Sequence, residues 1–338
     1  MKLTLQDIAG IANIGREGLG SYHRQYYRGS SEREKKKLVV SKIREAEEER
    51  RLVRIAALAQ QSRSLQWGVP QRVVKDRDMR ETPEALFKFQ IKVLYDLLPT
   101  PSNKNRWFRT DQFTCHLCGG SGTIEHILSS CKVALAQGRY TYRHDRVLRE
   151  ISYWVDEKRK EVNSTPWSKR TGIKFIKAGE KSKPSSIKVQ GETFLKTARD
   201  WKIQADLPES RLTVPAEIAA TSQRPDIMIS SKSTHQLILI ELTVPMEGRS
   251  EISSQLKAEK YEQGIAEAAG KKGWRTRIYT VEVGCRGYPA SSMNRMITEL
   301  GYIGKQKRDI LKKIARIAEE SSMMIWKCSQ FKQWGEKA

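Results

Sequence analysis

The sequence predicts an α+β fold in which a mixed β-sheet carries helices on its faces. Two short apolar runs, 227–229 and 237–242, are separated by the polar stretch 230–235, which is typical of two strands joined by a turn. A helical pattern then continues to residue 269, and a third apolar run covers 276–283. A strand, a helix and a further strand in this order predict a crossover between strands of one sheet.

The composition predicts a soluble protein with a polyanionic partner. The chain has 338 residues, of which 62 are Lys or Arg and 39 are Asp or Glu, and its net charge is +23. Such a surplus of positive charge favours DNA or RNA as the partner. No apolar run reaches the roughly 18 residues that a membrane-spanning helix needs, so we expect no membrane partner. The first residues lack the pattern of a secretion signal.

The cysteines point to a reduced compartment inside the cell. There are five, an odd number, and three of them lie close together between residues 115 and 131. Secreted disulfide frameworks usually contain an even number of cysteines spread along the chain. We therefore expect metal binding rather than disulfide bonds.

Residues 1–80 form the first predicted region, which is basic and helical. Within it, 31–63 has the pattern of one long helix, with Ser30 or Ser31 as N-cap and Glu32 in the first turn. The alternating charges of this helix favour a solvated face with i,i+4 pairs. A nucleic-acid contact is the alternative for its basic residues, namely Arg33, Lys35, Lys36 and Lys37.

The second predicted region, 81–155, contains a helix and a metal site. An amphipathic pattern predicts the helix over 83–98. Three cysteines and one histidine then follow with the spacing C-x2-C-x7-H-x4-C, namely Cys115, Cys118, His126 and Cys131. Thiolate and imidazole ligands at such spacing are typical of tetrahedral Zn²⁺. Four protein ligands leave no open coordination position, so we expect a small zinc knuckle with a structural role.

A basic and aromatic run follows the knuckle at 137–147, which reads QGRYTYRHDRV. Arginines interleaved with aromatic rings suit contact with phosphates and stacking on bases. The residues that we predict to contact nucleic acid are Arg139, Tyr140, Arg143, His144 and Arg146, joined by Arg224 further along the chain. A basic helix face packed on the knuckle is the alternative, and the sequence leaves both interpretations open.

Three further regions complete the predicted organisation. The polar and basic stretch 156–190 predicts an exposed linker. Residues 191–303 carry the predicted sheet, beginning with a helix from 191, and 304–338 carries a C-terminal amphipathic helix.

Two carboxylates at strand ends suggest chemistry in the 191–303 region. Asp226 opens the first predicted strand and Glu241 lies near the end of the second, so antiparallel pairing could bring them side by side. Paired carboxylates repel unless a cation lies between them, and hard oxygen ligands select Mg²⁺. With a nearby lysine, this set of groups suits metal-dependent hydrolysis of phosphodiesters. A β-hairpin with solvated charges at its ends is the alternative.

Together these motifs resemble the C-terminal region of a non-LTR retrotransposon polyprotein, of the site-specific clade that inserts into ribosomal DNA. In that family a CCHC knuckle is followed by GRYxWRHxxVL, and residues 138–148 read GRYTYRHDRVL. The family motifs RPD, (D/E)-x-T-V-P and K-x-x-K-Y match 224–226, 241–245 and 257–261. A later VEVG-x-RG motif matches 281–287.

The resemblance implies a PD-(D/E)xK restriction-endonuclease-like core that nicks target DNA with Mg²⁺ or Mn²⁺. Asp226 and Glu241 would be the metal carboxylates. The basic catalytic residue would come from the following helix as Lys257 or Lys260, with Tyr261 beside it. The implied partners are DNA and the element's RNA, and the implied location is the nucleus. A catalytically inactive, zinc-dependent nucleic-acid-binding remnant is the alternative function.

The chain departs from this family in one respect. No Y/F-x-D-D signature of a reverse transcriptase occurs in it. We therefore expect no reverse transcription by this chain, and interpret it as a truncated element, a fragment of a longer reading frame or a host gene derived from one.

Overall fold

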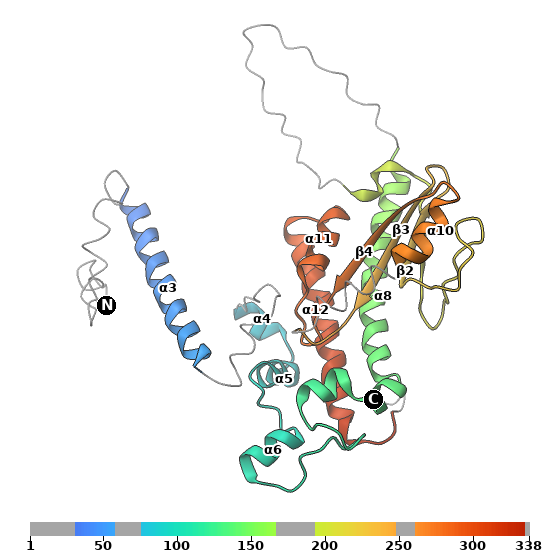
Figure 1. Cartoon of the computed structure of the whole chain (residues 1–338). Helices are drawn as coiled ribbons and strands as arrows, with labels where there is room; N and C mark the ends of the chain where they lie inside the picture. Colours follow the sequence, from blue (N-terminus) through green and yellow to red (C-terminus); the bar gives the residue numbers. More distant parts are fainter. Residues whose placement is uncertain (1–30, 58–75, 167–192, 248–260, 335–338) are drawn as a thin grey trace. The chain divides into compact units, whose positions relative to one another are not determined.

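The computed structural model describes residues 31–57, 76–166, 193–247 and 261–334 (Figure 1). The chain divides into two compact units, Met1–Leu65 and Gln66–Ala338. The described part of the first unit is helix α3, Glu32–Ala56. Ser31 caps it, because the Ser31 hydroxyl accepts the Glu34 N–H and the Glu34 carboxylate accepts the Ser31 N–H. None of its residues is buried, as expected for a solvated helix.

A four-stranded mixed sheet forms the centre of the second unit, with strand order β1-β2-β3-β4. The strands are β1 (Lys202–Ala205), β2 (Ile227–Ser231), β3 (Gln236–Thr243) and β4 (Arg275–Glu282). The first three pair antiparallel, and β3 pairs parallel with β4. The predicted α+β class and the mixed sheet are therefore confirmed, whereas β1 was not predicted, because it is short and only half-buried.

One face of the sheet is covered by two long helices and a shorter one (Figure 1). They are α8 (Arg139–Ser164), α11 (Ser291–Glu299) and α12 (Gly304–Lys327). Alternate strand residues such as Ile240 and Val281 point to this face, where they pack with Ile151 of α8. The core of the unit lies in this layer.

The other face packs against a shorter helical segment. This segment consists of the π-helical turn η5 (Glu262–Ala266) and α10 (Glu267–Gly270). Met228 of β2 and Leu239 of β3 contact Tyr261 and Ile265 in this second apolar cluster. Because successive side chains of a strand point to opposite faces, Leu237, Leu239 and Glu241 lie on the same face.

Helix α8 corrects the predicted linker. The exposed connection expected from residue 156 does not begin there, because α8 continues to Ser164. Val162 is buried, and the Lys158 ammonium lies 4.6 Å from the centre of the Tyr302 ring. The helix predicted from 191 is also wrong, since the chain forms only the 3₁₀ turn η3 (Phe194–Thr197) there. Helix α8, and no helix beginning at residue 191, covers the face of the sheet that carries Ile240 and Val281.

Smaller helices complete the second unit. They are α4 (Asp76–Glu81), α5 (Glu84–Leu94), α6 (Pro101–Phe108), the π-helical η2 (His126–Ser130), α7 (Lys132–Ala136) and the 3₁₀ turn η6 (Cys328–Gln330). Helix α5, which matches the predicted helix over 83–98, packs Leu86 and Phe89 in a cluster with Ile325 of α12. Among the described residues, no helix combines the length and the apolar character that crossing a bilayer requires.

Candidate metal centres and nucleic-acid surface

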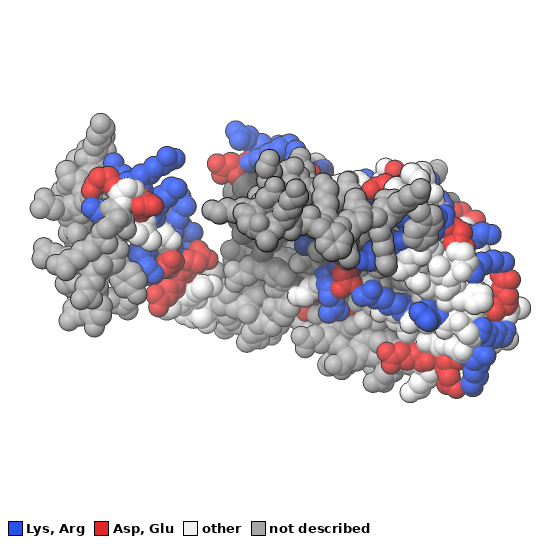
Figure 2. All heavy atoms as spheres, turned by 90° about the horizontal axis from the view of Figure 1, so that it is seen from above, with Lys and Arg blue, Asp and Glu red and all other residues white. Residues whose placement is uncertain are grey.

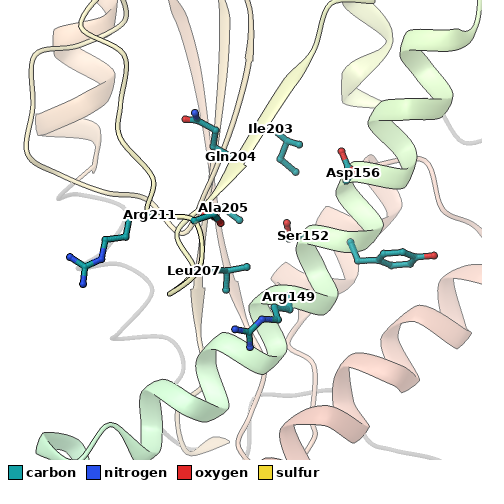
Figure 3. Close-up of a pocket in the computed structure, with 10 residues that line it drawn as sticks. Arg149, Ser152, Asp156, Ile203, Gln204, Ala205, Leu207 and Arg211 are labelled. Atoms are coloured by element: carbon teal, nitrogen blue, oxygen red, sulfur yellow. The ribbon is translucent and has the colours of Figure 1, made fainter.

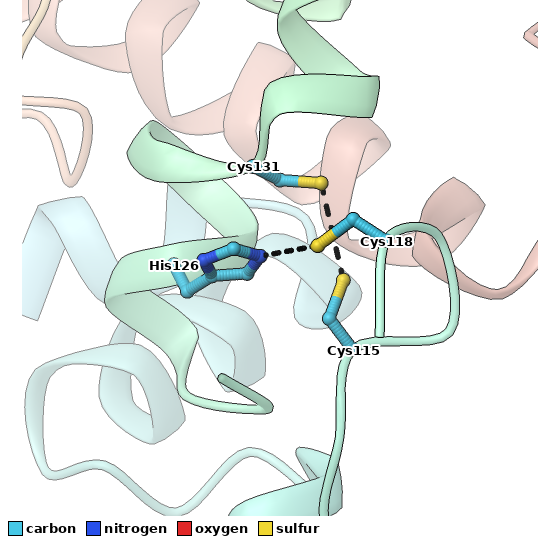
Figure 4. Close-up of side chains that lie close together, drawn as sticks. All are labelled: Cys115, Cys118, His126 and Cys131. Carbon is cyan, nitrogen blue, oxygen red and sulfur yellow. Dashed lines mark hydrogen bonds between the residues drawn. The ribbon is translucent and has the colours of Figure 1, made fainter. Parts of the chain in front are cut away.

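The four predicted zinc ligands come together in one cluster (Figure 4). Their ligand atoms all lie within 4.8 Å of one another. The Sγ atoms of Cys115 and Cys131 are 3.9 Å apart, and Nε2 of His126 lies 3.1 Å from Sγ of Cys118. Two thiolates on one tetrahedral zinc ion lie about 3.8 Å apart. The cluster is therefore a possible metal site, consistent with the predicted zinc.

Burial favours the neutral forms of Cys115 and His126. It raises the pKa of the Cys115 thiol to about 11, so this thiol is protonated near neutral pH unless a metal ion displaces the proton. Burial also lowers the pKa of His126, which favours the neutral imidazole that metals bind. Cys118 is also buried in part, which raises its pKa, but hydrogen bonds from the Gly120 N–H and neighbouring thiols outweigh this effect and lower it.

Glycines shape the loop that carries the first two ligands. Gly119 has φ of +70°, a left-handed conformation that side chains disfavour. Its turn is closed by the hydrogen bond from the Cys115 N–H to the Gly120 carbonyl at 2.7 Å. At Gly122 a Cβ atom would lie only 2.3 Å from the Phe113 carbonyl oxygen. The loop therefore lies tightly against the segment before Cys115.

The first turns of α8 fasten the cluster to the sheet. The Tyr140 hydroxyl accepts the N–H of the ligand Cys131 at 3.0 Å. The Arg143 guanidinium donates to the carbonyl of Leu128 in η2 at 2.9 Å and to the carbonyl of Val244, just after β3, at 3.1 Å. One arginine thus joins the helix before the last zinc ligand to the end of the strand that carries Glu241.

The structure brings Asp226 and Glu241 together at the end of the sheet. The register pairs Ile227 with Ile240, so Asp226 and Glu241 are opposite each other in the next position. The Glu241 carboxylate accepts the backbone N–H of Asp226 at 3.3 Å, and the Asp226 Oδ2 accepts the N–H of Leu242 at 2.7 Å. Side-chain exposure is 15% for Asp226, and Glu241 is 5% exposed as a residue. Two carboxylates thus share a largely buried site.

His144 of α8 also reaches this site. Its Nε2 lies 3.3 Å from Asp226 Oδ2, and its Nδ1 lies 3.1 Å from Asp145 Oδ1. Burial alone would lower the pKa of His144, but the hydrogen bonds to Asp145 and Asp226 outweigh this effect and raise it to about 9. The sequence motif pointed to nucleic acid for this histidine, and no sequence signal pairs it with Asp226.

Tyr261 lies beside the carboxylates, while the two candidate lysines, Lys257 and Lys260, lie outside the described residues. The Tyr261 hydroxyl donates to the carbonyl of Arg224 at 2.9 Å. Burial and the nearby charges of Glu241 and Asp226 raise the pKa of Tyr261. Its hydroxyl therefore stays protonated and serves as a donor.

Part of the predicted nucleic-acid surface is buried, which corrects its interpretation. Arg139 is fully buried, donates to the carbonyls of Cys328 and Phe331, and stacks on Trp334. Arg143 is 2% exposed, and Tyr140 supports the zinc cluster. Arg139 and Arg143 are therefore buried and Tyr140 is partly buried, so these three side chains pack α8 against its surroundings and offer little surface to nucleic acid.

Two of the predicted contact residues keep access to solvent. Arg146 is half-buried and lies 3.4 Å from the Glu320 carboxylate. Arg224 is exposed beside the carboxylate site, 3.8 Å from Asp206. Figure 2 shows Lys and Arg side chains interspersed with Asp and Glu over the visible face. Arg146 and Arg224 therefore remain accessible, each near a carboxylate, and fewer of the predicted residues than expected can contact nucleic acid.

A separate hollow of about 500 Å³ lies between α8 and β1 (Figure 3). Its lining includes Arg149 and Ser152 of α8 and Ile203 of β1 but none of the predicted site residues. The Arg149 guanidinium makes two bonds to the Glu209 carboxylate, at 2.9 and 2.8 Å. Arg211 also lines the hollow, so it holds one arginine paired with Glu209 and a second arginine from the loop after β1.

No protein-family model matches the chain, and no curated protein matches it significantly.

Proposed function

We propose that this chain is a metal-dependent DNA endonuclease, with Asp226 and Glu241 as its metal carboxylates. The observation that carries the proposal is the pairing of these two residues on adjacent strands in a largely buried site. Like charges this close favour a bound cation, and one or two carboxylates together with substrate phosphates form the usual Mg²⁺ site. The order Asp, turn, Glu, helix on a mixed sheet fits a PD-(D/E)xK core.

The residues of the chain would divide the work as follows. Among the described residues, His144 and the Leu242 N–H contact Asp226 at its Oδ2, and Asp226 and Glu241 are the residues that would hold the metal. When bound, Mg²⁺ or Mn²⁺ would polarise the scissile phosphate and lower the pKa of an attacking water. Lys260, or Lys257 in its place, would offset the charge of the pentacovalent transition state. Tyr261 would hold the backbone before Asp226 through the Arg224 carbonyl.

The Cys/His cluster would have a structural part in this function. A zinc ion held by Cys115, Cys118, His126 and Cys131 would order the chain between residues 110 and 147, which includes the start of α8. Since His144 lies within that range, the zinc site would support the Asp226 site through α8. The substrate would be nuclear DNA, and the element's RNA is a further candidate ligand.

Nicking of a supercoiled plasmid tests the proposal. With Mg²⁺ or Mn²⁺ the parent protein should convert the plasmid to the open-circular form, and Asp226→Ala should not. Binding of the same DNA should be unchanged in the variant, because the substitution removes a metal ligand and no cation. Asp309→Ala, which removes an exposed carboxylate of α12 outside the site, is the matched control.

Two outcomes would contradict the nuclease proposal. One is no cleavage with either metal, and the other is undiminished cleavage by Asp226→Ala. The remaining hypothesis would then be a nucleic-acid-binding protein without catalytic activity, and its support would be the measured DNA affinity. That affinity should fall steeply as salt rises, because contacts with phosphates release counterions. An affinity that does not change with salt would count against both functions.

A further inference from the structure

An exposed aromatic segment, residues 106–113, lies immediately before the zinc-ligand loop. Within it, Trp107 is 41% exposed, Phe108 72% and Phe113 57%. The Trp107 and Phe108 rings contact edge to face, with centroids 6.2 Å apart. Single exposed apolar residues are ordinary on a protein surface, but three aromatic rings within so short a stretch indicate a contact surface.

Positive charge accompanies these rings. The segment contains Arg106 and Arg109, and Lys104 precedes it on α6. The Arg106 guanidinium lies 3.6 Å from the Asp96 carboxylate, which offsets part of its positive charge. Arg109 is exposed, and it forms no ion pair with any of the described residues. Asp111 is the one acidic residue in the segment. Exposed rings with an excess of cations match the two parts of a nucleotide, a flat base and an anionic phosphate.

The segment is held in place by its surroundings. Helix α6 is capped at one end by the Thr100 hydroxyl, which accepts the Asn103 N–H. It ends at Arg109 in the left-handed conformation, with φ of +52°. Beyond it, Thr114 forms a β-bridge with Ser121 of the zinc-ligand loop. A backbone that is ordered before binding reduces the conformational entropy lost when a ligand stacks on the rings that it carries.

We propose that segment 106–113 binds single-stranded nucleic acid, with bases stacked on the exposed rings and phosphates near Arg109. It is a second contact surface, separate from Asp226 and Glu241 and different from the α8 residues that the sequence suggested. The choice of DNA as ligand rests on the proposed nuclease function. The zinc-ligand loop would then support a stacking surface as well as the start of α8.

Equilibrium binding of a short fluorescein-labelled single DNA strand of mixed sequence tests this proposal. The full chain carrying Asp226→Ala, without divalent metal, serves as parent, so that cleavage plays no part in the measurement. Phe108→Ala and Phe113→Ala should each raise the Kd about ten-fold, as expected for loss of a stacked base. Arg109→Asn should weaken binding and reduce its salt dependence, and asparagine tolerates the left-handed backbone.

Phe331→Ala is the matched control, because Phe331 is 63% exposed and lies outside the segment. It should leave the Kd unchanged, and zinc content and circular dichroism should show that every variant is folded. A Kd within about two-fold of the parent value for both Phe108→Ala and Phe113→Ala overturns the proposal and assigns the rings to a protein partner. An equal loss in Phe331→Ala overturns it too. If the variants lose binding while the native chain fails to nick DNA, the nuclease proposal alone fails.

Discussion

The Nε2 atom of His144 lies 3.3 Å from the Oδ2 atom of Asp226, so helix α8 holds one carboxylate of the proposed active site. The other ring nitrogen faces Asp145 at 3.1 Å. An imidazole between two carboxylates donates to both when it is protonated, and this arrangement fixes the orientation of Asp226. The residue four positions earlier on the same helix, Tyr140, supports the zinc ligand Cys131.

Replacing His144 should slow DNA nicking while DNA affinity is kept. We expect His144→Ala to lower the nicking rate at saturating Mg²⁺ by about ten-fold or more, because partners that orient metal ligands typically contribute that much. His144→Gln should recover part of the rate, since its amide can still donate to Asp226. His235→Asn changes a histidine in the β2–β3 turn and should be neutral. Equal rates for His144→Ala and the parent would refute the positioning role.

The purified protein should contain about one equivalent of zinc. Cys118→Ser should reduce the zinc content below half an equivalent, because a three-ligand site binds zinc much more weakly. Metal analysis by mass spectrometry measures this directly, and Cys328→Ser, outside the cluster, is the control. Zinc content that is low in the parent and unchanged in Cys118→Ser would exclude the site.

Asp200 should make the protein sensitive to acid. Partial burial raises its pKa, but hydrogen bonds from Ser231 and Ser233 outweigh this effect and lower the pKa to about 2. Because the folded pKa lies below the unfolded value of about 3.9, the stabilisation is present above about pH 4 and is lost as the pH falls through 2. Asp200→Asn should therefore cost about 1 kcal/mol near neutral pH, a small value because this carboxylate is mostly solvated.

Urea unfolding at several pH values measures this contribution. The difference in unfolding free energy between the parent and Asp200→Asn should shrink below about pH 4. Asp111→Asn, at an exposed position, should show no comparable change. A difference that stays constant down to pH 2 would show that the hydrogen bonds do not depend on the charge of Asp200.

Ile151 should be among the residues that matter most for stability. It is fully buried where α8 packs on the sheet. Ile151→Ala should lower the unfolding free energy by about 2–5 kcal/mol, since it removes buried methyl groups and leaves a cavity. Ile303→Ala, at a position that is 46% exposed, should cost much less. Comparable losses in the two variants would contradict the packing described for α8.

The parts of the site that depend on local patterns could be predicted from the sequence. The spacing of Cys115 and Cys118 with His126 and Cys131 is set by one short loop and one helical turn, so the cluster follows from local geometry. Asp226 and Glu241 flank a hairpin, whose antiparallel register brings strand ends together. Both inferences need only neighbouring elements.

The parts that depend on distant contacts could not be predicted. Arg139 is in a basic and aromatic run, but its partners are carbonyls near residue 330, so its burial has no local signal. The stretch after 156 looks like a solvated linker because Lys158 and Glu161 are charged, although Lys158 is buried and its ammonium lies over the Tyr302 ring. The aromatic rings of segment 106–113 are visible in the sequence, but their exposure is not.

Helix α8 also decides how this protein can be dissected. A fragment that begins at residue 191 would keep all four strands but lose the helix that supplies Val147, Ile151 and Val155 to one face of the sheet. The apolar side chains on that face would then be exposed to water, and such a fragment should aggregate. The shortest fragment that keeps this face covered must therefore begin before Arg139, where α8 starts.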